Sequence, residues 1–233
     1  MNKSRMDKAA LILPAYNEEK NIKIVINEAK KFLPNSLIIV IDDGSKDKTF
    51  ELAKKSGVVV LRHEKNKGKG EAIKTGFNYL KGKNVDFIIV VDTDRQYQIK
   101  DAPKFIKPLK EEKADFVMGK RDWSKVPLRH KFGNFVWRTS FNLLFKQRME
   151  DTNCGFVAFS RKAMEEIKDD IHGGYILEDQ MLISAVKNNL KIAQVPVAIT
   201  YRKRSGFLRG IRMVFGVLIF VIKEGIKYRL GID

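Results

Sequence analysis

Short apolar runs, each followed by a polar turn and an amphipathic stretch, fill the first half of the sequence and constrain its fold. The runs are rich in β-branched and aliphatic residues and lack strict alternation, which is typical of strands buried on both faces. Repeated strand–helix units imply right-handed crossovers and a mostly parallel sheet with helices on both faces, which is an α/β fold. The expected strands span residues 9–17, 36–45, 58–66, 86–94 and 114–121, and the expected helices between them span 18–33, 46–56, 68–82 and 101–113, with Asp47 and Asp101 as helix N-caps.

The second half of the sequence departs from this rhythm. Residues 123–148 mix basic and aromatic residues at helical spacing, and 178–189 predict a further helix. Residues 155–160 and 191–204 predict two more extended segments. Because no internal repeat or low-complexity linker separates these parts, we expect one catalytic domain over residues 1–206, followed by an amphipathic helix over residues 207–233.

The C-terminal helix has an apolar centre from Met213 to Ile222, which is shorter than the roughly 20 residues needed to cross a bilayer. Cations flank this centre on both sides, as in helices that lie in the plane of a membrane surface. The alternative interpretation is a terminal helix packed on the protein core or against a second copy of the chain. The flanking cations are Arg209, Arg212, Lys223, Lys227 and Arg229.

The charge balance favours anionic partners. The chain has 45 Lys and Arg against 28 Asp and Glu, a formal charge of +17, which suits nucleic acid, phosphorylated substrates or a lipid surface. The single cysteine, Cys154, allows no internal disulfide, and the first residues lack an apolar signal segment. We therefore expect a cytoplasmic protein.

Glycine-rich nucleotide-binding motifs are absent: the sequence contains neither G-x-G-x-x-G nor G-x-x-x-x-G-K-[ST]. Acidic residues and a tyrosine instead follow three of the apolar runs. Because the carboxyl ends of parallel strands meet at one edge of a sheet, we expect these side chains to line one cleft. They are Tyr16 and Glu18, Asp42 and Asp43, and Asp92 and Asp94.

Asp92 and Asp94 follow the fourth apolar run directly, separated by one residue. One interpretation of this Asp-x-Asp pair is purely structural: the two side chains can stabilise a turn or cap a helix. Two like charges at the mouth of a buried strand are, however, best tolerated when a cation joins them. With the Gln96 carbonyl as a third ligand, the set contains only oxygen donors, which suits Mg²⁺ or Mn²⁺ better than zinc.

Two further polar features remain open to two interpretations each. Asp42 precedes Gly44 and can belong to a tight turn, or its carboxylate can accept hydrogen bonds from a base or a ribose. Lys67 and Lys69 alternate with glycines at the start of a predicted helix. This pattern resembles a phosphate cradle, and equally a glycine-rich turn with surface lysines.

Taken together, the motifs resemble glycosyltransferase family 2, and especially its polyprenyl-phosphate branch, which includes dolichol-phosphate mannose synthase. The resemblance runs in order from about residue 11 to residue 204. It rests on PAYNEE, IDDGSKDKT, NKGKGEAIKTG, DTDRQ, GKR, DTNCGFVAFSRKA, EDQML, VPV and YRKR.

The resemblance implies a glycosyltransferase-A fold with a Rossmann-like sheet, and inverting sugar transfer from a nucleotide-diphosphate sugar with a divalent metal, Mg²⁺ or Mn²⁺. The residues that it assigns to the nucleotide sugar are Pro14, Tyr16, Glu18, Val40, Asp42, Lys69, Asp92, Thr93, Asp94 and Arg202, and those that it assigns to the metal are Asp92, Asp94 and Gln96.

The acceptor decides which further residues act. A hydroxyl acceptor needs a base, and Glu178 and Asp179 stand where the family carries one. A lipid phosphate is already an anion and needs cations to position it instead. The candidates are Arg121, Arg129, Lys131 and Arg138. The alternative interpretation is that these cations form a solvent-exposed basic surface without a role in binding. Arg121 fits the family pattern in GKR, whereas Gly133 stands where a serine is expected.

We therefore predict an enzyme that transfers a hexose from GDP-mannose or UDP-glucose to a polyprenyl (dolichyl) phosphate, peripheral to the cytoplasmic face of an anionic membrane. Its expected catalytic residues are Asp94, Asp179 and Arg121. The first alternative is a hydroxyl acceptor with Asp179 as base. A haloacid-dehalogenase-type phosphatase is disfavoured because Gln96 stands where that motif needs Thr or Val. A basic nucleic-acid-binding module rests on charge alone, so we expect no nucleic-acid partner.

Overall fold

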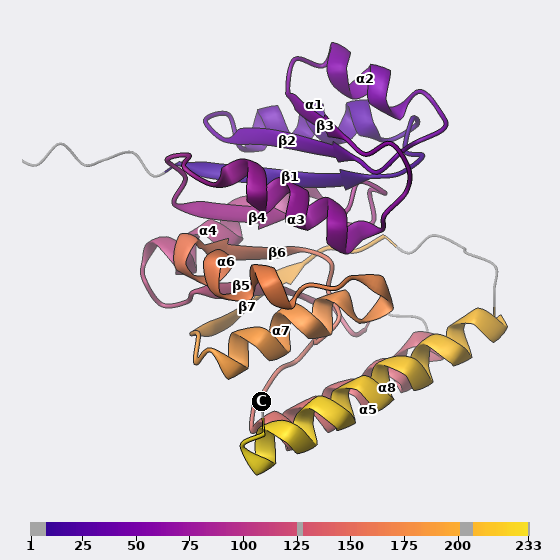
Figure 1. Cartoon of the computed structure of the whole chain (residues 1–233), viewed down its shortest axis with the longest axis vertical. Coiled ribbons are helices and arrows are strands. Elements are labelled where there is room, and N and C mark those ends of the chain that lie inside the picture. The colour runs from indigo at the N-terminus through magenta and orange to yellow at the C-terminus, as the bar shows by residue number, and fades with distance from the viewer. Residues whose placement is uncertain (1–7, 125–127, 201–206, 233) are drawn as a thin grey trace, which may run out of the picture.

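The computed structural model describes residues 8–124, 128–200 and 207–232 of the 233-residue chain. Within these residues the strands form one seven-stranded sheet in the order β3-β2-β1-β4-β6-β5-β7 (Figure 1). The α/β prediction is confirmed. The strands are β1 (Ala9–Ala15), β2 (Leu37–Asp42), β3 (Val59–Arg62), β4 (Phe87–Val90), β5 (Phe116–Arg121), β6 (Val157–Ser160) and β7 (Ile192–Val197).

The sheet is mostly parallel, as predicted. β1, β2, β3 and β4 run in one direction, and β5 pairs in parallel with β7. β6 is inserted between β4 and β5 and is antiparallel to both, with Val90 opposite Val157. The carboxyl ends of β1, β2 and β4 therefore lie at the same sheet edge as the amino end of β6. Residues that follow β1, β2 and β4 can therefore contact residues that precede β6 at this edge.

Helices cover both faces of the sheet. In Figure 1, α3, α6 and α7 lie in front of the sheet and α4 lies behind it. The helices are α1 (Ile22–Phe32), α2 (Thr49–Lys55), α3 (Lys69–Leu80), α4 (Ala102–Lys110), α5 (Leu128–Phe145), α6 (Arg161–Ile167), α7 (Leu177–Lys187) and α8 (Phe207–Leu230).

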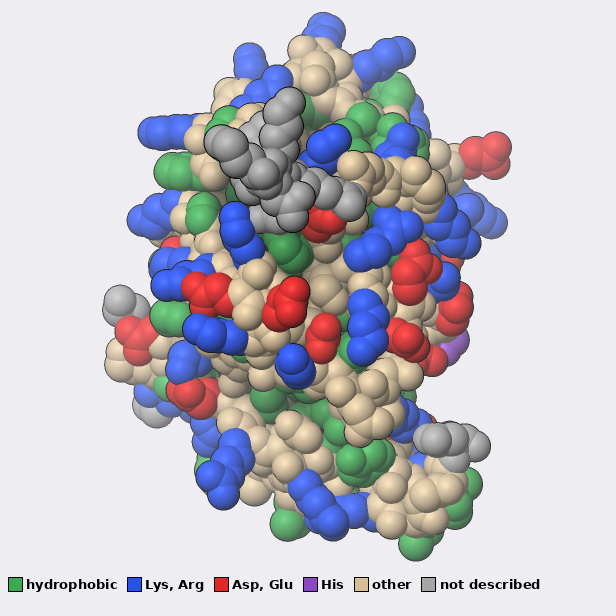
Figure 2. Space-filling view, turned by 90° about the vertical axis from the view of Figure 1, so that its left-hand side faces the viewer, with side chains coloured by type: hydrophobic (Ala, Val, Ile, Leu, Met, Phe, Trp, Pro, Cys, Tyr) green, Lys and Arg blue, Asp and Glu red, His purple; other side chains and the backbone are tan. Residues whose placement is uncertain are grey.

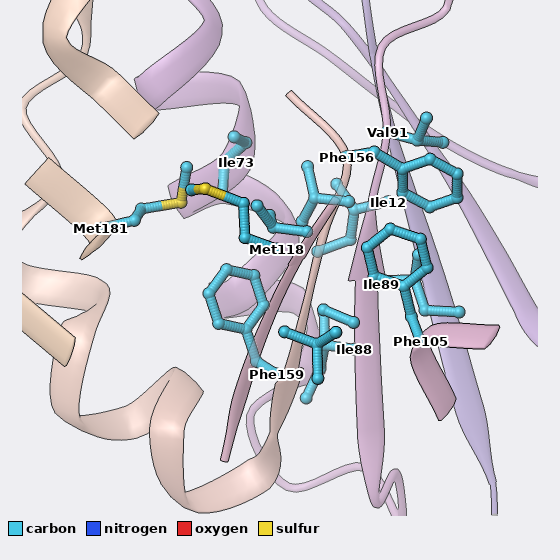
Figure 3. Packing of buried hydrophobic residues seen from close by; sticks show 14 of the residues in the cluster. Ile12, Ile73, Ile88, Ile89, Val91, Phe105, Met118, Phe156, Phe159 and Met181 are labelled. Carbon is cyan, nitrogen blue, oxygen red and sulfur yellow. The ribbon is translucent and has the colours of Figure 1, made fainter. Parts of the chain in front are cut away.

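Both sheet faces carry tightly packed apolar side chains (Figure 3). On one face, Phe105 of α4 stacks on Phe156 with ring centroids 4.2 Å apart. On the other face, Phe77 of α3 meets Phe159 edge to face at 5.7 Å. Ile12 and Ile89, in the middle of the sheet, are fully buried. This continuous core fixes the strand ends that build the site.

Of the two predicted helix N-caps, one is displaced by a residue and the other is confirmed, and both carboxylates bond residues outside their helix. Asp47 lies one residue before the N-cap of α2, which is Lys48, so its predicted position was wrong. Its carboxylate still accepts a hydrogen bond from the Thr49 amide at 2.9 Å. Asp101 does occupy the N-cap of α4, but its carboxylate bonds Lys104 Nζ and the Ala198 amide instead of a helix amide.

The sequence reading missed α6 and three 3₁₀ turns, namely η1 (Ile99–Asp101), η2 (Lys168–Asp170) and η3 (Gly174–Ile176). A signal for α6 was present: Ser160 is its N-cap, and the hydroxyl accepts a hydrogen bond from the Ala163 amide at 3.1 Å. The 3₁₀ turns are too short to leave a periodic pattern.

The C-terminal helix α8 packs beside α5, below the sheet in Figure 1. Gly225 lets the two helices approach closely, since a Cβ there would lie 2.6 Å from Leu144 Cβ. The rings of Phe145 and Tyr228 lie 5.2 Å apart, and Arg229 donates to the carbonyls of Leu143 and Leu144. The predicted C-terminal helix is thus confirmed. In the part of the chain described here, α8 included, none of the helices combines the length and the apolarity that a bilayer crossing needs.

Candidate functional site

A pocket of about 500 Å³ opens at the sheet edge where β1, β2 and β4 end. The pocket brings together residues from four separate parts of the first half of the chain, as the acidic strand ends predicted. Its lining residues are Pro14, Ala15, Tyr16, Glu18, Asp43, Asn66, Gly68, Lys69, Ala72, Asp92, Thr93 and Asp94. The positions of Val40 and Asp42 differ from this: both are fully buried in β2 beneath the pocket.

Asp92 and Asp94 stand at the pocket, directly beyond β4. The Thr93 hydroxyl between them donates to the carbonyl of Pro14 at 2.8 Å, which ties this segment to β1. Gln96 donates both its backbone amide (3.0 Å) and its side-chain amide (2.7 Å) to the Asp94 carboxylate. The backbone oxygen of Gln96 accepts from the Thr200 amide. Gln96 therefore orients Asp94 in this structure.

Lys69, the first residue of α3, joins two carboxylates from distant parts of the chain. Its Nζ lies 2.6 Å from Asp92 Oδ1 and 2.8 Å from Glu178 Oε1. Burial alone would lower the pKa of Lys69, but the two carboxylates outweigh burial and raise it. Burial raises the pKa of Asp92, an effect that Lys69 partly offsets. Burial also acts to raise the pKa of Glu178, but Lys69 outweighs it and the pKa is lowered.

A buried Asp43–His63 pair holds the turn that leads into Lys69. The Asp43 carboxylate accepts hydrogen bonds from the amides of Lys67 and Gly68 at 2.8 Å each. It also forms a hydrogen bond of 2.7 Å with His63 Nδ1. The other ring nitrogen of His63 bonds the Thr75 hydroxyl at 2.9 Å. The sequence reading gave His63 no role. Because two successive amides donate hydrogen bonds to the Asp43 carboxylate, Asp43 holds the conformation of this turn. In the sequence, the alternating glycines were the only sign of the turn.

Asp42 forms a separate ion pair beneath the pocket. Its Oδ2 lies 3.0 Å from Nε of Arg62, without the geometry of a hydrogen bond, and its Oδ1 accepts from the Ser45 amide at 3.3 Å. Both contacts belong to the turn after β2 and the neighbouring strand β3. Of the two interpretations left open by the sequence, the turn role of Asp42 is what these contacts describe.

Glu178 and Asp179 lie in the first turn of α7, where the helix dipole favours negative charge. Asp179 is fully buried. Among the described residues, its Oδ1 has no hydrogen-bond partner, and its Oδ2 accepts a long bond of 3.5 Å from Asn153 Nδ2. Burial, and then the neighbouring charge of Glu178, raise the pKa of Asp179 well above its ordinary value. A carboxylate with a raised pKa is a stronger base once it has ionised.

Arg121, at the end of β5, is locked into a bidentate ion pair. Its Nε and Nη2 lie 2.6 and 2.7 Å from the two carboxylate oxygens of Asp151, and its backbone amide donates to the same group. Both side chains are more than nine-tenths buried. Burial acts to lower the pKa of Arg121, but Asp151 outweighs burial and raises it.

Of the other predicted acceptor cations, Lys131 and Arg138 are not among the residues that line the pocket. Arg129 and Lys131 belong to α5, and the description of Arg129 extends only to its backbone. Arg138 lies 3.4 Å from the carbonyl of Glu150 and stacks near Trp123. Arg202 lies outside the described residues.

The donor set fits a metal that keeps sites free for substrate. Among the residues that the structure describes, His, Cys, Asp and Glu nowhere form a group of three or more with metal-binding geometry. Asp92 and Asp94 are two hard oxygen ligands beside an open pocket. Mg²⁺ and Mn²⁺ are often held by one or two carboxylates together with substrate phosphates, so these residues fit such an ion.

Comparisons with known proteins agree with this geometry. Residues 10–168 match the family model described as "Glycosyl transferase family 2". The chain is 32% identical over 233 residues to the UDP-N-acetylglucosamine–dolichyl-phosphate N-acetylglucosaminyltransferase of Methanococcus voltae, covering 90% of this chain and 92% of that protein. It is 35% identical to the uncharacterized protein MJ1222 of Methanocaldococcus jannaschii, covering 94% and 92% respectively.

The solved structures agree on the fold. Glucosyl-3-phosphoglycerate synthase from Mycobacterium tuberculosis, in a complex with Mn²⁺, UDP and phosphoglyceric acid, superposes with a TM-score of 0.78. The match covers 98% of this chain and 80% of that chain at 22% sequence identity.

Proposed function

The chain belongs to glycosyl transferase family 2, and from this membership we propose that it transfers a sugar from a nucleotide-diphosphate sugar to a polyprenyl phosphate at a membrane surface. One observation carries the donor half of this proposal: Asp92, Asp94 and Lys69 converge on one open pocket beside Tyr16 and Glu18. Two carboxylates and an ammonium suit a site that holds a diphosphate together with a divalent cation.

Each part of the pocket has a role in this proposal. Tyr16 and Glu18 hold the nucleoside end, and Asp92 and Asp94 would hold Mg²⁺ or Mn²⁺ against the diphosphate. When bound, such an ion neutralises the charge that develops on the leaving diphosphate. The acceptor phosphate oxygen attacks the anomeric carbon as the bond to the diphosphate breaks. Because the acceptor is already an anion, the chain has to position it and need not remove a proton.

The relatives support a lipid phosphate acceptor. The M. voltae protein is named for transfer to dolichyl phosphate, and it aligns with 90% of this chain. Its donor is UDP-N-acetylglucosamine, which adds a third sugar to the GDP-mannose and UDP-glucose expected from the sequence. The acceptor class is therefore better supported than the sugar.

The exposed face of α8 supports a membrane location for the reaction. Its apolar residues recur every three or four positions, and Ile219 and Leu230 are 65% and 66% exposed. The full stripe is Phe215, Ile219, Ile222, Ile226 and Leu230.

Charge around this stripe favours a lipid surface over a second copy of the chain. Glu224 is the one acid in α8, and it is paired with Lys187 and Lys227. Lys223 and Arg229 lie along the exposed side. The lower end of the molecule in Figure 2, where α5 and α8 lie, shows apolar and basic side chains with little acidic surface. Two copies would oppose like charges, whereas anionic headgroups would complement them.

The proposal is tested by incubating the purified protein with Mn²⁺, polyprenyl phosphate and radiolabelled UDP-N-acetylglucosamine, UDP-glucose or GDP-mannose in parallel, followed by organic extraction. We expect label in the lipid phase with one donor, and its loss when EDTA is added. No lipid-phase label with any donor, while Mn²⁺-dependent nucleotide binding persists, would contradict the lipid acceptor and leave the donor site standing.

Substitution within the α8 stripe tests the membrane surface. Ile219→Asp should weaken binding to vesicles of mixed anionic and zwitterionic phospholipid by about tenfold or more, because one buried isoleucine contributes roughly 1.5–3 kcal/mol. Vesicle sedimentation measures this. Ile24→Asp, at an exposed isoleucine of α1, is the matched control and should bind like the unmodified protein. Equal binding by both variants would show that α8 does not enter the bilayer.

A hydroxyl acceptor is the second candidate, and the buried Oδ1 of Asp179, which has no partner within the described part of the chain, favours it. Asp179→Asn separates the two. If Asp179 is a general base, turnover should fall on the order of 10²–10⁴-fold. For a phosphate nucleophile we expect a loss of less than about tenfold, because no proton has to be removed. Transfer rates are compared at equal metal and donor saturation, with the melting temperature as the folding control.

A further inference from the structure

Lys69 is placed so that its ammonium is shared between the proposed metal ligand Asp92 and the acid Glu178. The Nζ–O distances are 2.6 and 2.8 Å, and the three side chains are only 28%, 30% and 14% exposed. The pair therefore lies inside the site and is not a solvated surface contact. An ion held this closely by two carboxylates already performs part of the neutralisation that a metal would provide.

The backbone around this cluster is built to hold it closed. A Cβ on Gly155 would lie 2.4 Å from Asp92 Oδ2 and 3.1 Å from Lys69 Nζ, so no larger residue fits there without displacing the cluster. On the other side, a Cβ on Gly70 would lie 2.5 Å from the Cα of Gly173, which brings α3 against the segment before α7. The Asp43 carboxylate holds the amides of Lys67 and Gly68, which fixes where Lys69 begins its helix.

A divalent cation and the Lys69 ammonium cannot both share Asp92 at low cost. Like charges a few ångströms apart in a partly buried site repel strongly. A nucleoside diphosphate changes this balance, because its oxygens bind an ammonium and a metal at the same time. With such a ligand present, the ammonium can keep Glu178 and exchange Asp92 for a diphosphate oxygen.

We propose that Lys69 is a resident counter-ion that competes with the divalent metal for Asp92, so that the metal binds tightly only together with a nucleoside diphosphate. The inference rests on the proposed function only in taking Asp92 as a metal ligand. In this proposal, binding of the nucleotide donor, and not of the free metal, releases Asp92 from Lys69. It also gives Lys69 a positioning role that a phosphate cradle alone would not have.

The test is a titration of the full chain with Mn²⁺, following free Mn²⁺ by electron paramagnetic resonance, with and without UDP or GDP. The unmodified protein should bind Mn²⁺ weakly alone, and a nucleotide should strengthen this binding. Lys69→Met, which removes the charge and keeps a flexible chain, should bind Mn²⁺ alone about tenfold more tightly, within the usual range of coupling between sites. Its gain on adding nucleotide should be smaller.

Two variants keep the test specific. Lys69→Arg keeps the cation and should bind Mn²⁺ as weakly as the unmodified protein. Lys65→Met removes one charge from an exposed position in the loop before α3 and should not change Mn²⁺ binding. Equal or weaker Mn²⁺ binding by Lys69→Met would overturn the proposal, as would tight Mn²⁺ binding by the unmodified protein without nucleotide or equal tightening by Lys65→Met. Because these readouts need no acceptor, a failure of sugar transfer would leave them unaffected.

Discussion

Asp94→Asn is expected to lower sugar transfer by two to three orders of magnitude, about the loss seen when one preorganised electrostatic contact to the transition state is removed. The substitution keeps the shape of the side chain and one acceptor for the Gln96 amide, but it removes a charge from the pocket. Binding of the metal and stabilisation of the leaving diphosphate both depend on that charge. Initial rates measured across a range of Mn²⁺ concentrations would show the loss.

The control for this prediction is Glu71→Gln, which removes a carboxylate from a half-exposed ion pair with Lys74 on α3. It should change turnover by less than about twofold, since exposed pairs of this kind contribute little. Both variants should keep the melting temperature of the unmodified protein. Full activity of Asp94→Asn at low Mn²⁺ would mean that this carboxylate is not a metal ligand.

Asp151→Ala is expected to destabilise the protein by about 3–5 kcal/mol, because it leaves the buried guanidinium of Arg121 without its carboxylate. Nε, Nη2 and the backbone amide of Arg121 all bond this one carboxylate, so its removal breaks three contacts at once. Urea denaturation gives the free energy of unfolding. The adjacent pair Lys120–Glu150 joins the same two segments at 2.5 Å but is more exposed, so Glu150→Ala should cost at most about 1 kcal/mol.

A double substitution separates the structural part of Arg121 from its predicted contact with the acceptor. Arg121→Met combined with Asp151→Leu removes both charges and should recover most of the stability. If this stable double variant still transfers sugar at the normal rate, Arg121 acts only in folding. If the protein is stable but transfer is lost, Arg121 has the acceptor role expected from GKR. Destabilisation by Glu150→Ala equal to that by Asp151→Ala would contradict the buried-pair argument.

The sequence was sufficient for the fold because its signals are local. Apolar runs such as residues 86–94 mark buried strands, and the acids that follow them mark the sheet edge that carries the pocket. Long-range pairing could not be read in this way. Lys69 and Glu178 lie 109 positions apart, and Arg121 and Asp151 lie 30 apart, so no spacing pattern predicts either pair. Asp42 and Asp43 are adjacent in the sequence but have different partners, since Asp42 lies beside Arg62 whereas Asp43 bonds His63 and the Lys67 amide.

Helix boundaries failed for a related physical reason. The predicted start of α2 assumed that Asp47 caps it, but the carboxylate of Asp47 is shared between the amide of Thr49, the first residue of α2, and the amide of Glu19 in the loop after β1. When a capping side chain also makes a tertiary contact, the helix can begin a residue or more away from the position that the sequence pattern predicts. The pocket residues at strand ends were predicted more accurately than the helix boundaries, because a buried strand ends where its apolar run ends.

The reversed direction of β6 has a consequence for how the protein acquires activity as it folds. β1, β2 and β3 pair with one another across only 27 and 20 positions (37 − 10 and 59 − 39), so the part of the pocket that they carry can assemble early. Gly155, which shapes the space around Asp92, arrives only when Val157 pairs with Val90 across 67 positions (157 − 90). Asp92 also depends on the pairing of Phe87 with Ala9 across 78 positions (87 − 9), and Lys69 meets Glu178 across 109 positions. The charged centre therefore rests on long-range contacts, and we expect a chain that ends before β6 to hold the β1–β3 part of the pocket without a working catalytic centre.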